Sequence, residues 1–354
     1  VVAMESKGRT WTRPELNARV GNLAQLGGVR KLVLDEGRAK GVSAYDVDTG
    51  GGLCFSVLAD RGMDISRCSY KGTNLVYLTP NGEAHPAFYE PEGLGWLRTF
   101  FGGLLTTCGL THLGPPGEDR GEQLGLHGRY STTPAIQVQD RSTWDGDEYR
   151  ICLVGTMHDT VLFGDKLQLV RTIETALGSR RVTITDCVEN VGYESAPFTI
   201  LYHINAGFPL LDAASRLAVS AEKSEPCDAN AAAAIDEHLE FSPPRAGFIE
   251  QNFLHTMRPG ADGTAWAAMV NPELNGGLGL QLSFDTKQLP YLNEWKMMGR
   301  RDYVVGIEPC NVPCRNRSVL REQGLLPMLE AGEQRSTAVE IAVLEGMDEI
   351  GAYL

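Results

Sequence analysis

Short runs of alternating apolar and polar residues, or of β-branched residues, recur along most of the chain. A period of two places successive side chains on opposite faces of a strand, so these runs predict β-strands. The runs lie at residues 31–34, 53–58, 135–139, 149–157, 167–173, 181–189, 198–204, 278–284, 303–307 and 338–344. The pattern therefore predicts a β-dominated protein.

Glycine-rich and asparagine-rich segments separate several of these runs. Examples are residues 48–52 (DTGGG), 145–147 (DGD) and 275–277 (NGG). Glycine and asparagine supply the positive φ that tight hairpin turns require, so neighbouring strands are expected to run antiparallel. The 40 glycines of the chain are scattered and not periodic, which fits many turns and excludes a collagen-like repeat.

Helical periodicity is weak. Residues 14–26 predict a short helix near the N-terminus, and residues 229–239 predict a second short helix or a loop. Strands and helices do not alternate, which argues against a doubly wound nucleotide-binding fold. Residues 110–133 contain little alternation and two adjacent prolines, so we expect surface loops near a functional face there.

No proline- or serine-rich linker divides the chain. We therefore expect an all-β protein built as one large antiparallel β-sandwich across residues 1–354, with residues 1–28 as a candidate N-terminal helical extension. A chain of 354 residues that is 42% apolar and 22% charged can bury a large core.

The charge of the chain argues against two classes of partner. The formal net charge is −13 and no run of Lys and Arg is longer than a pair, so we expect neither nucleic-acid binding nor attachment to a membrane surface. No stretch approaches the roughly 20 apolar residues of a membrane span, and the default expectation is a cytoplasmic protein. The eight cysteines are dispersed, which predicts reduced, mostly structural thiols.

The usual phosphate-loop, dinucleotide, zinc-protease and nucleophile-elbow motifs are absent from the sequence. What remains is a set of polar residues in apolar or glycine-rich surroundings. His203 interrupts an apolar strand, where a hydrogen-bonded core residue is the simpler interpretation. Glu308 ends an apolar run before a proline and is equally consistent with an exposed strand end or with a buried general base.

Other candidates have plainer alternatives. His127 and Arg129 follow one another closely in a glycine-rich loop, where both could simply be solvated. Arg61 and Asp64 most economically form a turn with internal ion pairs. Trp295 could belong to the core, although a Trp among polar residues also suits stacking against a sugar face.

The order of these motifs resembles the galactose mutarotase-like superfamily. The segments that carry the resemblance are residues 101–108 (FGGLLTTC), 126–129 (LHGR), 202–205 (YHIN) and 306–309 (GIEP). Residues 60–65 (DRGMDI), 247–251 (GFIEQ) and 308–311 (EPCN) are more similar to a poorly characterised aldose 1-epimerase-like branch. The resemblance covers roughly residues 29–344.

The resemblance implies a large β-supersandwich with a monosaccharide on its concave face, and an isomerase that interconverts α and β anomers. It implies Glu308 as general base and His203 as general acid, with no metal or organic cofactor. The implied sugar-binding residues are His127, Arg129, Arg61 and Glu250, although Gln251 could take the place of Glu250 because this segment aligns less surely. Trp295 joins them as the stacking candidate.

Three functions are compatible with the sequence. The first is a mutarotase for a free or acidic aldose, with a small-molecule sugar as partner and oligomeric state undecided. The second is a metal-dependent sugar isomerase or lyase that uses His127, His203 and Glu308 as ligands. The third is a catalytically silent sugar-binding protein on the same fold.

Overall fold

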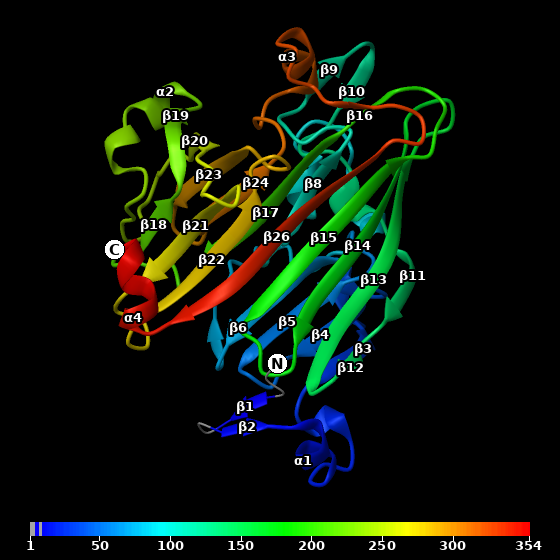
Figure 1. Ribbon diagram of the computed structural model, residues 1–354. Helices are drawn as coiled ribbons and strands as arrows, with labels where there is room; N and C mark the ends of the chain where they lie inside the picture. The colour runs from blue at the N-terminus through cyan, green and yellow to red at the C-terminus, as the bar shows by residue number, and fades with distance from the viewer. Residues whose placement is uncertain (1–3, 7–8) are drawn as a thin grey trace.

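The computed structural model describes residues 4–6 and 9–354 and consists of two layers of antiparallel strands (Figure 1). The front layer in this view is a nine-stranded sheet. Its strands, in spatial order, are β11 (Ile136–Asp140), β13 (Glu148–Thr160), β14 (Lys166–Ala176), β15 (Arg181–Asn190), β26 (Gln334–Glu345), β22 (Leu278–Asp285), β21 (Thr264–Asn271) and β18 (Arg216–Val219), with β12 (Thr143–Asp145) also paired to β13.

The second layer contains two sheets. The six-stranded sheet has the order β19 (Ala221–Pro226), β20 (Gln251–Met257), β23 (Tyr291–Met298), β24 (Tyr303–Cys310), β17 (Thr199–Gly207) and β8 (Thr106–Leu110). The five-stranded sheet has the order β3 (Gly28–Val33), β4 (Ser43–Asp48), β5 (Leu53–Leu58), β6 (Asp64–Tyr70) and β7 (Thr73–Asn74). Isolated bridges between Ile65 and Leu105 and between Val76 and Ala206 connect the two sheets.

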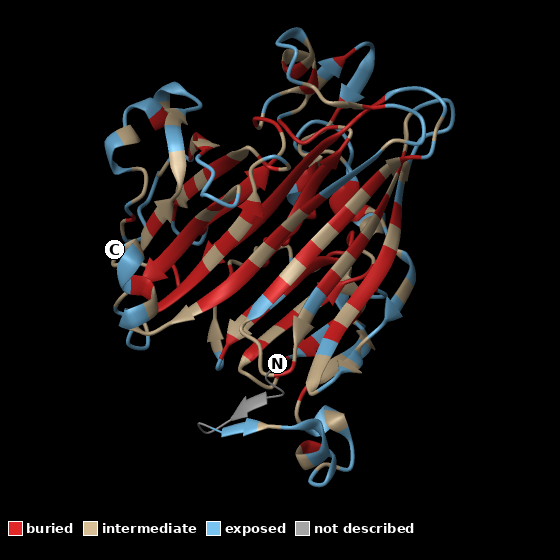
Figure 2. Ribbon diagram, in the orientation of Figure 1, coloured by how far each residue is buried: buried red, intermediate tan, exposed pale blue. Residues whose placement is uncertain are grey.

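Alternation builds the core. Buried and partly exposed residues alternate along β14 and β15, as Figure 2 shows, because successive side chains point to opposite faces. The inward side chains of all three sheets form one large apolar cluster. β17 and β24 are buried at every position, so polar residues on them are not placed there by contact with bulk water.

Helices are short and peripheral. They are α1 (Arg13–Asn17), α2 (Ala229–Ala232), α3 (Arg317–Glu322) and α4 (Met347–Ile350). Small two-stranded pairs are β1 (Met4–Ser6) with β2 (Arg9–Trp11), β9 (Gly117–Asp119) with β10 (Glu122–Leu124), and β16 (Ala196–Pro197) with β25 (Met328–Leu329). No helix in the described part of the chain is long and apolar enough to cross a membrane.

All ten predicted strand runs coincide with observed strands, and the all-β prediction is confirmed. The helix predicted over residues 14–26 is wrong in extent: α1 ends at Asn17, and only a 3₁₀ turn at Leu23–Gln25 follows. Residues 229–239 likewise divide into α2 and a 3₁₀ turn at Ile235–Glu237. Within the predicted extension 1–28, residues 1–3 and 7–8 lie outside the described residues.

Candidate functional site

His203 and Glu308 lie side by side at the centre of the six-stranded sheet. β17 and β24 pair antiparallel with Ile204 opposite Ile307, and this register brings the two polar residues onto the same face. His203 Nε2 lies 3.2 Å from Glu308 Oε1. The side chains are only 4% and 1% exposed. The structure thus brings together the two residues that the resemblance names as acid and base.

Burial governs the protonation of this pair. Desolvation raises the pKa of Glu308 to about 8, against a smaller opposing effect of the hydrogen bond from Asn293. Desolvation, together with the nearby His127, lowers the pKa of His203 well below its ordinary value. The raised pKa of Glu308 favours its protonated carboxyl form near neutral pH, and the lowered pKa of His203 favours the neutral imidazole.

Two polar atoms of the pair have no hydrogen-bond partner among the described residues. They are His203 Nδ1 and Glu308 Oε1, whose contact with His203 lacks hydrogen-bond geometry. The other carboxylate oxygen of Glu308 accepts a hydrogen bond of 2.8 Å from Asn293 Nδ2. Unsatisfied buried polar atoms are rare in folded proteins, and Glu308 Oε1 keeps hydrogen-bonding capacity for a ligand.

His127 lies across from His203 on the loop before the 3₁₀ turn at Tyr130–Thr132. Its backbone has φ of 59°, and its Nδ1 lies 2.8 Å from the carbonyl oxygen of Leu113. Since a carbonyl only accepts, Nδ1 carries the proton and Nε2 is left as an acceptor. Burial lowers the pKa of His127 to about 4, which keeps the ring neutral. The His127 and His203 ring centroids are 5.9 Å apart.

Trp295 and Glu250 form the opposite wall. Trp295 lies opposite Gly306 on the neighbouring strand, and its Nε1 donates a hydrogen bond of 2.7 Å to Glu250 Oε2. Its ring centroid is 5.5 Å from that of His203. An aromatic plane beside polar groups is an arrangement that can hold the apolar face of a sugar ring.

These residues line a pocket of about 380 Å³, within the size range of small-molecule sites. The other lining residues are Leu94, Trp96, Leu97, Phe100, Pro115, Pro116, Leu126, Cys227, Asp228, Asn252, Asn293 and Cys314. The predicted surface segment 110–133 contributes Pro115, Pro116 and Leu126 to this wall, as expected for loops near a functional face.

Sequence reasoning missed several lining residues. Asn293 precedes Trp295 by two positions on β23, and the alternation of a strand places both side chains on one face. That spacing is the signal that could have identified Asn293. Trp96 and Asn252 lie in segments without a recognisable motif, and only the tertiary fold brings them to the pocket.

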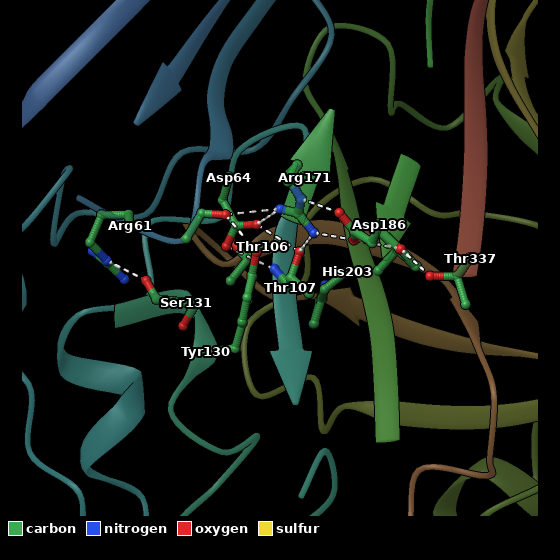
Figure 3. A network of polar contacts seen from close by, with 12 residues as sticks. Arg61, Asp64, Thr106, Thr107, Tyr130, Ser131, Arg171, Asp186, His203 and Thr337 are labelled. Carbon is green, nitrogen blue, oxygen red and sulfur yellow. Dashed lines mark hydrogen bonds and ion pairs between the residues drawn. The ribbon is translucent and has the colours of Figure 1, made fainter. Parts of the chain in front are cut away.

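Arg61 has a structural position instead of the expected contact with substrate. Its guanidinium is buried and donates to the carbonyl oxygens of Ser131, Ala84 and Thr99 at 2.6, 2.7 and 3.0 Å. Figure 3 shows it pointing to Ser131, while His203 lies on the other side of β8. The expected turn ion pair with Asp64 is also replaced, because Asp64 pairs with Arg171 at 2.8 Å.

Arg129 is exposed and does not line the pocket either. The described lining residues therefore include no Arg and no Lys, whereas Asp228, Glu250 and Glu308 are all carboxylic acids. The expected charge-assisted contacts from arginines to a sugar do not fit this arrangement. The predicted ligand triad of His127, His203 and Glu308 is also not among the metal-capable groups of the described residues.

Comparison with known proteins assigns the chain to a family. The family described as "Domain of unknown function (DUF4432)" matches residues 39–343. The chain belongs to this family. No curated protein matches it.

Solved structures extend this assignment to the fold. A "putative aldose 1-epimerase" from Klebsiella pneumoniae superposes with a TM-score of 0.87 at 25% identity, covering 92% of this chain and 85% of that one. A galactose mutarotase-like protein from Clostridium acetobutylicum superposes with a TM-score of 0.62 at 15% identity, covering 91% of this chain and 100% of that one. Galactose 1-epimerase from Lactobacillus acidophilus superposes with a TM-score of 0.56 at 14% identity, covering 90% of this chain and 99% of that one. This DUF4432 protein thus has the galactose mutarotase-like fold, and its branch is a poorly characterised one.

Proposed function

We propose that the pocket binds a monosaccharide and interconverts its α and β anomers, which makes the protein an aldose 1-epimerase. The observation that carries this proposal is the His203–Glu308 pair: two buried proton-transfer groups 3.2 Å apart that both line a small-molecule pocket, with Glu308 Oε1 unpartnered. Anomer exchange needs one acid and one base close together, because the ring oxygen and the anomeric hydroxyl share one carbon.

The single proton of the pair is sufficient for the reaction. In ring opening, Glu308 takes the proton of the anomeric hydroxyl while His203 gives one to the ring oxygen, and the C1–ring oxygen bond breaks to give the open-chain aldehyde. This leaves Glu308 protonated and His203 neutral, the same protonation state that burial favours in the free protein. After rotation about C1–C2 the reverse transfers close the ring on the other face. No proton is gained or lost overall.

Ring opening therefore starts from the protonation state opposite to the one that burial favours. A cyclic sugar needs the proton on His203 and the negative charge on Glu308, so its hydroxyls must compensate the cost of that charge separation. Glu308 Oε1, which has no partner of its own, is the atom that would accept the anomeric hydroxyl. His127 Nε2 would accept a hydrogen bond from a neighbouring hydroxyl.

Pocket charge favours a neutral sugar over an acidic one. Three carboxylic acids and no Arg or Lys stand among the described lining residues, so a uronic acid or sugar phosphate would meet no counter-charge. We therefore propose a free, uncharged aldose as the substrate class. Trp295, held by its hydrogen bond to Glu250, would stack against the apolar face of that sugar.

Exchange NMR tests the proposal directly. Neutral aldoses and uronic acids are screened for acceleration of α/β exchange by the wild type, Glu308→Gln and His203→Asn, with the exposed His158→Asn as matched control. We expect a neutral aldose to exchange faster with wild type and His158→Asn, and each pocket variant to lose about 10²–10⁴-fold.

The same experiment identifies the alternative of a silent sugar-binding protein. If wild type binds a sugar, seen as saturation transfer to its protons, but exchanges the anomers no faster than the two pocket variants, the epimerase proposal fails. An exchange rate that depends on added metal and disappears with a chelator would instead favour the metal-dependent alternative.

A further inference from the structure

A second group of polar side chains lies on the other face of the six-stranded sheet. Within β23, Asn293 and Trp295 line the pocket, so the residue between them, Glu294, points to the opposite side. His255 on β20 lies diagonally across from Glu294, since Phe253 pairs with Glu294 and His255 with Leu292. His238 reaches the same place from the segment after the 3₁₀ turn at Ile235–Glu237.

The ligand atoms of this group converge. One atom each of His238, His255 and Glu294 lies within 4.8 Å of the other two, and this is the one such group found among the described residues. His255 Nε2 forms a hydrogen bond of 3.2 Å with Glu294 Oε2, which a bound metal ion would replace. The two imidazoles stack with centroids 5.5 Å apart and an angle of 26° between their planes.

Unpartnered atoms point to a missing ligand. Glu294 and His255 are fully buried, yet Glu294 Oε1 and His238 Nε2 have no hydrogen-bond partner among the described residues. A buried carboxylate oxygen without a partner is destabilising, because it loses its hydrogen bonds to water and gains none in the fold. Two such atoms, from different segments of the chain, belong to the same group of convergent ligand residues, and a metal ion would take electron pairs from both.

An outer hydrogen bond holds the His238 imidazole in the state that a metal requires. His238 Nδ1 lies 2.6 Å from the carbonyl oxygen of Ile235, and His255 Nδ1 lies 2.8 Å from Ser224 Oγ. The carbonyl fixes the proton of His238 on Nδ1 and leaves Nε2 with a free lone pair. Metal-binding histidines almost always have their second ring nitrogen hydrogen-bonded in this way.

We propose that His238, His255 and Glu294 form a binding site for a divalent transition metal of the Zn²⁺ class. Two imidazoles and one carboxylate suit Zn²⁺. His255 Nε2 and Glu294 Oε2 are already 3.2 Å apart, which is close to the spacing of two ligands that bind one ion with bonds of about 2.0–2.1 Å. The site is separate from the sugar pocket and does not depend on the proposed epimerase activity.

The metal would fasten a surface segment to the sheet. His238 follows a short 3₁₀ turn, whereas His255 and Glu294 belong to paired central strands, so one ion would join the two. The ammonium group of Lys296 already links the same segment to the sheet, since it donates a hydrogen bond of 2.9 Å to the carbonyl oxygen of Glu237. The ion would thus add a second link, to the side chain of His238, beside this link to the backbone.

Metal titration of the full chain tests this site. Chelator-treated protein is titrated with Zn²⁺ by calorimetry, and with Co²⁺ by visible absorption, for wild type, Glu294→Gln, His255→Asn and His238→Asn. His158→Asn controls for binding to an exposed histidine, and His203→Asn controls for binding in the sugar pocket. We expect one ion per chain and affinity at least tenfold weaker in each of the three ligand variants, with both controls like wild type.

Two outcomes would overturn the proposal. One is the absence of stoichiometric binding to the wild type, and the other is binding that survives all three ligand substitutions or is lost in His203→Asn. His238 is only partly buried and its variant is the one least prone to unfold, so its circular dichroism spectrum and Zn²⁺ affinity decide the case if His255→Asn fails to fold.

Discussion

At the scale of single residues, the buried carboxyl of Glu308 makes stability depend on pH. Burial raises the pKa of this group to about 8 from its ordinary value of 4.5. Between these two values the folded state keeps a proton that the unfolded state releases. The contribution of Glu308 to stability is therefore fully present below about pH 4.5 and is lost as the pH rises toward 8.

Glu308→Gln removes this loss, since an amide does not ionise. We expect the free energy of unfolding of Glu308→Gln, relative to wild type, to increase by the order of 2–4 kcal/mol between pH 5 and pH 8. Urea unfolding at pH 5, 6.5 and 8 measures the difference. The exposed Glu174→Gln is the control, and its difference from wild type is expected to stay small at all three values. A pH-independent difference for Glu308→Gln would show that Glu308 ionises in the folded protein as it does in water.

Polar residues within apolar strand segments were the sequence signal that identified the centre of the site. The predicted pair of His203 and Glu308 is brought together, and His127 and Trp295 line the same pocket. Arg61 could not be placed from sequence, because its role depends on three carbonyl groups that local spacing does not show. A guanidinium is equally suited to a ligand and to backbone oxygens, and only the fold decides between them.

At the scale of elements, three neighbouring strands carry the central residues of the pocket. β17 contributes His203, β24 contributes Glu308, and β23 contributes Trp295. Gly306 lies between them: a Cβ at this position would be 2.2 Å from Glu308 Oε1, 3.0 Å from His203 Cε1 and 3.1 Å from Trp295 Cβ. The missing side chain is what allows these three groups to meet.

Gly306→Ala is therefore expected to displace the Glu308 carboxylate. We expect anomer exchange to be at least tenfold slower than in wild type and the thermal midpoint to be lower. The added methyl group would overlap the Glu308 carboxylate and crowd the His203 ring. Gly351→Ala is the matched control, since a Cβ there meets nothing within 4 Å. Exchange NMR and thermal unfolding of both variants provide the comparison. Wild-type exchange in Gly306→Ala would mean that the carboxylate position is not critical.

Strand elements were predictable and helical elements were not. Alternation identified β14 and β15 because one face of each is buried and the other is not. The helix expected over residues 14–26 fails for a local reason. The segment carries a capping box at Thr12 with Glu15 and a second one at Asn22 with Gln25, so it begins two short turns and does not continue one helix.

At the scale of the whole molecule, one buried guanidinium connects all three sheets. Arg171 on β14 pairs with Asp186 on β15 at 2.7 Å and with Asp64 on β6 at 2.8 Å. It also donates a hydrogen bond of 2.9 Å to Thr107 Oγ1 on β8 (Figure 3). Tyr202 precedes His203 on β17, and its hydroxyl donates a hydrogen bond of 2.6 Å to Asp186 Oδ2. This network fixes the strand that carries His203 relative to the other layer.

Arg171→Met tests whether this network joins the layers. It leaves the carboxyl groups of Asp64 and Asp186 buried without their cation, so we expect a loss of about 3–5 kcal/mol in the free energy of unfolding, measured with urea at pH 7.5. Arg150→Ala breaks exposed ion pairs to Asp145 and Glu148 and is expected to cost less than about 1 kcal/mol.

A triple variant, Arg171→Met with Asp64→Asn and Asp186→Asn, separates the cost of unpaired charge from that of lost contact. Because the amides carry no charge, we expect it to recover part of the stability lost in Arg171→Met. If Arg171→Met is as stable as Arg150→Ala, the apolar core alone holds the layers together. If the triple variant recovers nothing, the hydrogen bonds of the guanidinium, and not its charge, hold β8 and β17 in register with the opposite sheet.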